Sequence, residues 1–144
     1  MREGKSKTNP RSQKPFGHTP ATFAVYIVGV VLEWATEQGG LAAIEKRNEA
    51  KAKSLYDAID SSGGYYACPV EKAARSCMNV VYRIAGGNED VEKQFAKDAT
   101  AVGLVGLPGH RSVGGMRASI YNAVTLEAVE TLVKFMREFQ RTHG

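Results

Sequence analysis

Apolar and polar positions along the chain predict helices and strands in the order helix, helix, strand, strand, helix, strand, strand, helix. The first helix is expected at residues 20–38, because Thr19 is a good N-cap, proline fits the first helical position, and a Gly-Gly pair ends the pattern. The second is expected at residues 41–61, where apolar positions fall near one face and charged residues elsewhere.

The rest of the chain alternates short apolar runs with turns that contain glycine or proline. The predicted strands are residues 65–70, 78–85, 104–107 and 116–123, and the later helices are residues 91–102 and a last helix capped by Thr125. Runs of this kind favour an α+β, sandwich-like fold. In it, the long N-terminal helix and the further helices pack on one face of a small mixed or antiparallel sheet.

The first predicted helix is apolar on every side rather than along one stripe. Its apolar residues are Phe23, Ala24, Val25, Tyr26, Ile27, Val28, Val30, Val31 and Leu32. A helix of this kind must be covered all round. Two interpretations stay open: a partner subunit or a missing domain covers its second face, or the helix is the central helix of the core.

The composition is that of an ordinary globular domain, with 43% hydrophobic and 24% charged residues among 144. The net charge of +4 comes from the N-terminal tail. Residues 1–17 carry five basic groups and one acidic group, whereas the remaining 127 residues carry 14 of each sign. A basic tail on a neutral body is typical of a solvated arm rather than a nucleic-acid surface. Residues 1–17 are therefore predicted to be disordered, and residues 18–144 to form one domain.

Cys68 and Cys77 have no His or Cys near them at metal-ligand spacing, so we expect two free, reduced thiols and no metal site. The longest apolar run, residues 21–32, is too short to span a membrane. These features predict a cytoplasmic protein with no membrane role. The tail is basic and acid-poor like a transit peptide, which leaves organellar targeting open. Pro10 and Pro15 argue against it, because they would break the amphipathic helix of such a peptide.

The clearest chemistry lies in residues 109–123, where two arginines and a histidine flank a Gly-Gly turn at the entrance to a predicted strand. Such a turn lets His110, Arg111 and Arg117 converge on one cavity while the backbone approaches closely. A guanidinium binds a carboxylate or a phosphate through two parallel hydrogen bonds. The pattern indicates a site for a small dianion with two separated acidic ends, or else loop arginines that are simply solvated.

His-Arg-Ser-Val-Gly-Gly-Met-Arg-Ala-Ser-Ile-Tyr-Asn-Ala at residues 110–123 resembles the signature of the phosphoserine aminotransferases, which are fold-type I pyridoxal-phosphate enzymes. The resemblance spans residues 18–143. It includes Gly-Leu-Ala-Ala-Ile-Glu-Lys-Arg-Asn after the first helix, Cys-Pro-Val-Glu at residues 68–71, Arg-Ser-Cys-Met-Asn-Val at residues 75–80, and Asn-Ala-Val-Thr-Leu-Glu-Ala-Val from residue 122. The resemblance implies that the chain is the C-terminal small domain of such an enzyme.

The resemblance also implies roles for individual residues. Arg117 would hold the α-carboxylate shared by phosphoserine and glutamate, while His110 and Arg111 would hold the distal phosphate or side-chain carboxylate. Thr19 matches a threonine that touches the cofactor phosphate from a neighbouring subunit, which implies a homodimer, and a helix N-terminus favours a phosphate. The implied reaction, in serine biosynthesis, converts phosphohydroxypyruvate and glutamate to phosphoserine and 2-oxoglutarate.

The sequence departs from the family at two places. Where the family has Asn-Thr-Pro-Pro-Thr-Phe, residues 18–23 read His-Thr-Pro-Ala-Thr-Phe, so His18 replaces an amide donor to the cofactor phosphate. The family's large domain, with its Schiff-base lysine, is absent, and transamination needs that lysine. Ser-Gln-Lys-Pro-Phe-Gly at residues 12–17 resembles the segment around it, so Lys14 is either its relic or a chance Gln-Lys in a basic tail.

Three functions follow from these observations. The first is an aminotransferase small domain that acts only when a large domain completes it, so that the chain alone is inactive and binds no pyridoxal phosphate. The second is a non-catalytic dimerisation or anion-binding module left after loss of the cofactor domain. The third is nucleic-acid binding through the tail, which predicts an affinity that falls steeply with salt.

Overall fold

A computed structural model describes residues 21–144 of the chain. The chain divides into two compact units, Met1–Gln38 and Gly39–Gly144, and each is described by itself. The disordered tail expected at residues 1–17 and the helix start expected at Thr19 lie outside the described residues.

The described part of the first unit is one helix, α1 (Thr22–Glu37). None of its residues is buried. The exposed large apolar side chains are Phe23, Val25, Tyr26, Ile27, Val28, Val30, Val31 and Leu32. The apolar surface expected from the sequence is therefore present and exposed. Within its own unit the helix has no buried residue, so both interpretations of its apolar surface stay predictions.

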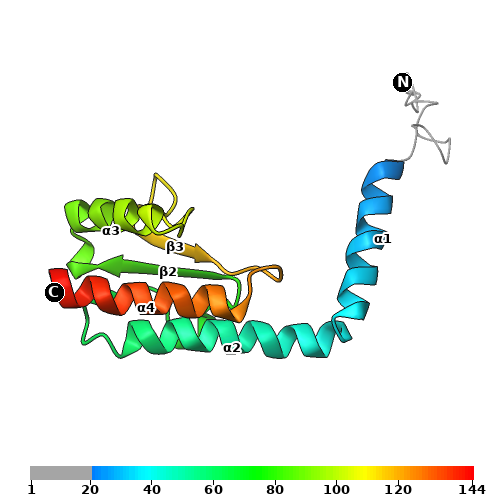
Figure 1. The fold of residues 1–144 in the computed structure, drawn as a ribbon, viewed down its shortest axis with the longest axis horizontal. Helices are drawn as coiled ribbons and strands as arrows, with labels where there is room; N and C mark the ends of the chain where they lie inside the picture. The colour runs from blue at the N-terminus through cyan, green and yellow to red at the C-terminus, as the bar shows by residue number, and fades with distance from the viewer. Residues whose placement is uncertain (1–20) are drawn as a thin grey trace, which may run out of the picture. The chain divides into compact units, whose positions relative to one another are not determined.

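The second unit contains three helices and a three-stranded antiparallel sheet (Figure 1). The helices are α2 (Gly40–Asp60), α3 (Glu89–Ala101) and α4 (Leu126–His143), and the strands are β1 (Tyr66–Ala67), β2 (Asn79–Ile84) and β3 (Met116–Ser119), in the spatial order β1-β2-β3. Two short 3₁₀ turns, η2 (Lys72–Ala74) and η3 (Ala85–Gly87), flank β2.

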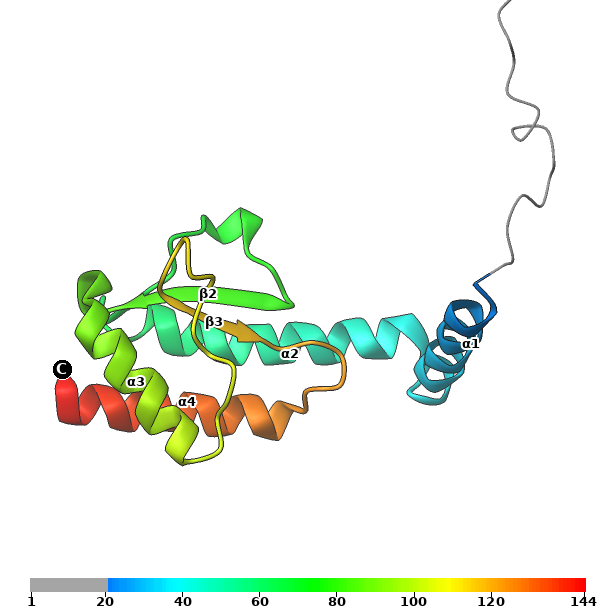
Figure 2. The same ribbon diagram turned by 90° about the horizontal axis from the view of Figure 1, so that it is seen from above.

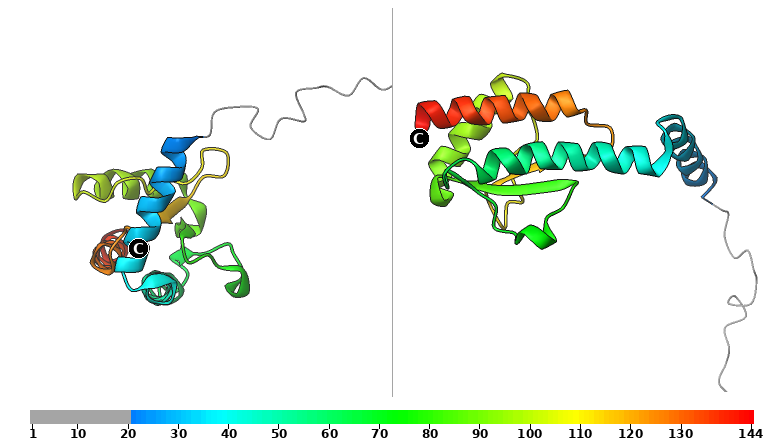
Figure 3. Two further views of the ribbon diagram at one scale, coloured as in Figure 1. Left: turned by 90° about the vertical axis from the view of Figure 1, so that its right-hand side faces the viewer. Right: turned by 90° about the horizontal axis from the view of Figure 1, so that it is seen from below.

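The three helices of this unit lie on one face of the sheet (Figure 2; Figure 3, left). The helices α2 and α4 lie side by side and run in the same direction (Figure 3, right). The predicted α+β fold, with helices on one face of a small antiparallel sheet, is confirmed.

The predicted strands are shorter than expected, and one of them is absent. Residues 65–70 pair only at β1, because Pro69 has no N–H to donate and the chain then turns into η2. Residues 104–107 form no strand, since the adjoining Pro108 makes a single bridge with Met116 and cannot extend a ladder. The strand expected at residues 116–123 stops at β3, because residues 121–124 form a turn.

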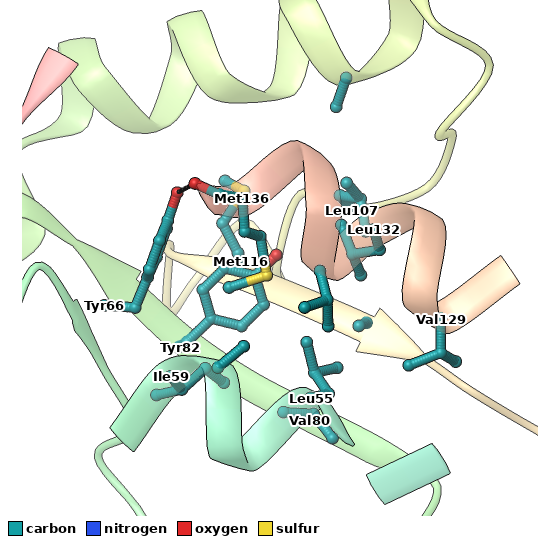
Figure 4. Packing of buried hydrophobic residues seen from close by; sticks show 14 of the residues in the cluster. Leu55, Ile59, Tyr66, Val80, Tyr82, Leu107, Met116, Val129, Leu132 and Met136 are labelled. Carbon is teal, nitrogen blue, oxygen red and sulfur yellow. Dashed lines mark hydrogen bonds between the residues drawn. The ribbon is translucent and has the colours of Figure 1, made fainter. Parts of the chain in front are cut away.

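The hydrophobic core lies between the sheet and the helices (Figure 4). In β2 burial alternates along the strand, as expected when one face is covered. The core residues of the strands are Tyr66, Val80, Tyr82, Ile84, Met116 and Ala118, and those of the helices include Leu55, Ile59, Phe95, Val129, Leu132, Met136 and Phe139. Tyr66 donates its hydroxyl to the Met136 carbonyl at 2.8 Å, and burial raises the pKa of this phenol.

The same alternation leaves a second set of side chains on the uncovered side of the sheet, here called the open face. Its residues are Asn79, Val81, Arg83, Arg117 and Ser119. The Oδ1 atom of Asn79 accepts hydrogen bonds from Ser119 Oγ at 3.2 Å and from Tyr121 Oη at 3.1 Å. Apart from Val81, the side chains on the open face are therefore polar.

A buried lysine of α2 fixes the turn that follows β3. The ammonium group of Lys51 donates to the carbonyl oxygens of Ile120 at 3.0 Å, Tyr121 at 2.8 Å and Val124 at 2.9 Å. Lys51 is 2% exposed, and its burial lowers the pKa of this amine. An ammonium group has three N–H donors, so the three carbonyls satisfy all of them. These bonds hold the C-terminal end of β3 against α2.

Both cysteines are free thiols, with Cys68 half-buried and Cys77 exposed. Within residues 21–144, no helix combines the length and the hydropathy that a membrane crossing requires.

Candidate anion-binding site

Residues 108–115 form a compact loop that leads into β3. The Gly114 N–H donates to the His110 carbonyl at 2.8 Å, and the Gly109 N–H donates to the Gly115 carbonyl at 2.8 Å. Gly114 and Gly115 have φ values of 73° and 71°, a region that glycine adopts without strain. A Cβ atom on Gly109 would lie 2.4 Å from the Gly114 carbonyl oxygen. The loop backbone therefore packs closely against itself.

Arg117 lies on the open face, directly after this loop. Its Cα pairs with that of Val81 across β2 and β3, and its N–H donates to the Leu107 carbonyl at 2.7 Å. The backbone is thereby held on both sides while the side chain is exposed. Among residues 21–144, the guanidinium groups of Arg117 and Arg111 have no ion pair. Both are available to an anionic ligand.

His110 is exposed and bonded within its own turn. Its Nδ1 atom lies 2.7 Å from Ser112 Oγ and accepts the Ser112 N–H at 3.3 Å. An Nδ1 atom that accepts a backbone N–H leaves the proton of a neutral imidazole on Nε2. This arrangement presents Nε2–H as a donor.

Two hollows adjoin the loop. The first, here called the sheet-face hollow, has a volume of about 190 Å³ and is lined by His110, Arg117 and Val81 among others. The second, the α3-side hollow, has a volume of about 470 Å³ and is lined by Arg111 and Lys93 among others. The structure thus places His110 and Arg117 at the sheet-face hollow and Arg111 at the α3-side hollow. Arg83 and residues of the loop line both hollows.

An ion pair under the loop was not anticipated from the sequence. Arg83 Nε donates to Glu92 Oε1 at 2.8 Å, and Arg83 Nη2 donates to the Gly87 carbonyl at 3.1 Å. Glu92 is 5% exposed, and its Oε1 atom also accepts the Ile84 N–H at 3.2 Å. Period-two alternation in the predicted strand at residues 78–85 was the signal that could have placed Arg83 on the same face as Val81.

The two predicted cofactor-phosphate residues, Thr19 and His18, lie outside the described residues, as does Lys14. Their predicted roles therefore stay predictions.

Two lysines of the second unit bear on whether its residues could hold pyridoxal phosphate. Such a site needs a lysine amine that is free to bond to the cofactor. The amine of Lys51 is buried and fully occupied by carbonyl oxygens. Lys93 reaches the α3-side hollow, but it is exposed and lies 3.5 Å from Glu89 and 3.7 Å from Asp90. Residues 21–144 also contain no cluster of His, Cys, Asp or Glu arranged for a metal ion.

Known proteins match most of this chain. The profile of the Aminotransferase class-V family matches residues 3–132. Phosphoserine aminotransferase of Geobacillus kaustophilus is 54% identical over 135 residues, which are 94% of this chain and 37% of that protein. The same-named protein of Nitrosomonas europaea is 57% identical over 127 residues, which are 88% of this chain and 34% of that protein.

Solved structures give the same relationship. Phosphoserine aminotransferase from Bacillus circulans subsp. alkalophilus superposes with a TM-score of 0.83 at 50% identity, over 89% of this chain and 35% of that one. A PLP-bound phosphoserine aminotransferase from Trichomonas vaginalis superposes with a TM-score of 0.77 at 40% identity, over 83% of this chain and 34% of that one. The chain spans about a third of the length of the relatives it matches.

Proposed function

Because the chain belongs to the class-V aminotransferase family, we propose that residues 18–144 are the C-terminal small domain of a phosphoserine aminotransferase, preceded by a basic tail at residues 1–17. The reaction is transfer of an amino group from glutamate to phosphohydroxypyruvate, which gives phosphoserine and 2-oxoglutarate. The observation that carries this proposal is the gathering of His110, Arg117 and Arg111 around one glycine-rich loop, with both guanidinium groups free of ion pairs among the described residues.

The substrate roles follow from the chemistry of these groups. Arg117 binds the α-carboxylate that phosphoserine and glutamate share, because a guanidinium matches a carboxylate with two parallel N–H donors. His110 and Arg111 bind the distal phosphate or carboxylate, which differs between the two substrates. One site with two anion-binding ends therefore accepts both substrates. In the cell this chemistry belongs to serine biosynthesis, and we expect it in the cytoplasm.

Pyridoxal phosphate, when bound to the enzyme, supplies the electron-withdrawing group that makes amino transfer feasible. Thr19 and His18, which precede α1 in the sequence, are proposed to contact its phosphate. The contribution of this chain is to bind and orient the substrate. Because neither Lys51 nor Lys93 fits the role of the cofactor lysine, we expect the chain alone to bind pyridoxal phosphate weakly or not at all and to be inactive.

Association with another polypeptide completes the proposal. Every large apolar side chain of α1 between Phe23 and Leu32 is exposed, and a monomeric protein rarely leaves so continuous an apolar surface in water. We propose that α1 mediates association, either as a homodimer or with a cofactor-binding domain. Nucleic acid is not a proposed partner, since the body of the chain is neutral.

A second function stays open because neither Lys51 nor Lys93 fits the role of the cofactor lysine. In that alternative the chain is a non-catalytic dimerisation or anion-binding module. Mixing the chain with a separately produced large domain of a relative separates the two: turnover in the mixture that is lost in Arg117→Ala favours the enzyme, whereas phosphoserine binding without turnover in the mixture favours the module.

The substrate site itself is tested by titrating ¹⁵N-labelled chain with O-phospho-L-serine. We expect shifts of the amide signals of residues 108–117 with a dissociation constant in the millimolar range, because each exposed arginine–anion contact contributes only about 0–1 kcal/mol. Arg117→Ala should abolish these shifts, whereas Arg137→Ala, which removes an exposed arginine of α4, should leave them unchanged. Equal binding by both variants would refute the assignment of Arg117.

A further inference from the structure

Arg83 lies between the sheet-face hollow and the α3-side hollow and lines both of them. The loop at residues 108–115 rests on its side chain. A Cβ atom on Gly115 would lie 2.7 Å from Arg83 Cδ and 3.3 Å from Arg83 Nε, and a Cβ atom on Gly114 would lie 3.8 Å from Arg83 Nη1. The glycine backbone therefore lies directly against the arginine side chain, a position that any larger residue would obstruct.

The orientation of Arg83 is set from the opposite side, by α3 and η3. The Nε atom is held by the Glu92 carboxylate at 2.8 Å and Nη2 by the Gly87 carbonyl at 3.1 Å. Glu92 is almost fully buried, and Arg83 is its only ion-pair partner among the described residues. A buried carboxylate is costly unless it is paired and hydrogen-bonded, so this contact has one strongly preferred geometry.

We propose that Arg83, oriented by Glu92, is a positioning residue that sets the conformation of the loop at residues 108–115. The loop carries His110 and Arg111 and leads into Arg117, so its conformation fixes how the three anion-binding groups are spaced. This inference rests on the proposed function of that loop as the substrate-anion site. Arg83 acts on the anion through the loop, and direct contact with the substrate is the competing explanation.

Hydrogen exchange tests the loop without any ligand. The Gly109 N–H, which bonds to the Gly115 carbonyl, and the Gly114 N–H, which bonds to the His110 carbonyl, report the loop directly. In Arg83→Met, we expect these two amides to exchange roughly tenfold faster, the scale of one lost charge-assisted hydrogen bond. The amides of Val80 and Tyr82 in β2 should keep their rates. The matched control is Arg141→Met, which breaks an exposed Arg–Glu pair on α4 and should change neither set.

The second measurement is the affinity for O-phospho-L-serine, followed by NMR in the same variants. We expect Arg83→Met to weaken binding several-fold together with the faster loop exchange. Weaker binding with unchanged loop exchange would show that Arg83 is a direct ligand, and unchanged values of both would show that it has no role; either result overturns the proposal. If the wild-type chain does not bind phosphoserine, the proposed function fails, while the exchange of Gly109 and Gly114 still decides whether Arg83 positions the loop.

A milder variant covers the case in which Arg83→Met fails to fold. Glu92→Gln keeps an oxygen that can accept from Arg83 Nε and from the Ile84 N–H, but it removes the charge. Faster exchange of the Gly109 and Gly114 amides in Glu92→Gln, smaller than in Arg83→Met, is the result we expect. Wild-type exchange of these amides in Glu92→Gln would overturn the role assigned to the ion pair.

Discussion

Arg75 and Asp60 form a bidentate ion pair, in which Arg75 Nη1 donates to Oδ2 at 2.8 Å and Nη2 donates to Oδ1 at 2.7 Å. The pair joins the segment before β2 to the end of α2, and the guanidinium also lies 4.5 Å from the centre of the Tyr56 ring. These hydrogen bonds from Arg75 lower the pKa of Asp60 below its ordinary value of 3.8. Because the folded-state pKa is the lower one, the stabilisation is complete above the unfolded-state pKa and is lost as pH falls through the folded-state pKa.

We therefore expect Asp60→Asn to lower the free energy of unfolding near neutral pH, and the difference from the wild type to shrink below about pH 4. Asp57→Asn is the control, because its ion pair with Lys53 is exposed on both sides and should contribute little at any pH. Urea unfolding followed by circular dichroism between pH 7 and pH 3 measures both variants. A difference for Asp60→Asn that stays constant across this range would contradict the prediction.

The buried amine of Lys51 should matter far more than an exposed lysine of the same helix. Lys51→Met leaves the carbonyls of Ile120, Tyr121 and Val124 without their donor, and we expect a loss of about 2 kcal/mol in the free energy of unfolding. Lys53→Met, which removes only an exposed pair, should change this free energy by less than about 0.5 kcal/mol. Thermal and urea unfolding of the two variants give the comparison, and equal effects would show that the three hydrogen bonds are not stabilising.

Gly115 has a positive φ and lies against Arg83, so replacing it should destabilise the fold both by backbone strain and by a steric clash. In Gly115→Ala the added Cβ meets Arg83 Cδ at 2.7 Å and the Tyr82 carbonyl oxygen at 3.1 Å. Gly106→Ala is a matched control, because Gly106 has a similar φ of 76° and no atom within 4 Å of its Cβ position. We expect a loss of about 1 kcal/mol for Gly106→Ala and about 2–3 kcal/mol for Gly115→Ala. Similar losses, measured by urea unfolding, would mean that the loop moves away freely from Arg83.

The apolar surface of α1 predicts self-association of the purified chain. We expect sedimentation velocity to show a dimer or larger species at micromolar concentration, together with binding of a hydrophobic dye. The double substitution Val28→Glu with Leu32→Glu, one turn apart on the helix, should shift the distribution towards monomer. Ala50→Glu, at an exposed position of α2, is the charge control and should leave it unchanged. A wild-type monomer at high concentration that binds no dye would contradict this prediction.

Aminotransferase activity is expected to be absent from the 144-residue chain alone. His110, Arg111 and Arg117 bind and orient a substrate, but they do not replace the lysine that carries the cofactor. Activity should appear only when a separately produced large domain, for example that of the Geobacillus kaustophilus relative, is added, and Arg117→Ala should then lose it. Turnover by the chain alone, blocked by borohydride with a pyridoxyl group on Lys14, would contradict this prediction and show that Lys14 serves as the cofactor lysine.

The sequence was sufficient for the parts of the fold in which one element carries its own signal. Three amphipathic helices have their apolar stripes buried as expected, and the predicted cap of α4 is present, since Thr125 Oγ1 accepts the Ala128 N–H at 3.2 Å. The start of α3 differs from the prediction because the N-cap residue Asn88 was not recognised in the sequence. Asn88 Oδ1 accepts the Asp90 N–H at 3.0 Å, so the helix begins two residues before the predicted position.

Features that depend on contacts between elements far apart in the sequence could not be predicted in the same way. The lengths of β1 and β3 depend on Pro69 and on the turn at residues 121–124, and also on where β2 can still pair with them, which no local pattern encodes. In the candidate site, the family signature indicated His110, Arg111 and Arg117. The support from Arg83 and Glu92 was missed because the two residues come from different elements and meet only after α3 packs against β2.

The helices of the second unit all lie on one face of the sheet, and this determines how strongly Arg117 can hold an anion. On the open face its guanidinium is in contact with bulk water, whose dielectric constant of about 80 weakens any attraction to a carboxylate. A surface that covered this face would lower the effective dielectric constant towards about 20 and strengthen the same contact roughly fourfold, with no change in the residues that make it. The strength of substrate binding is therefore a property of whatever encloses the open face as much as of the arginines themselves.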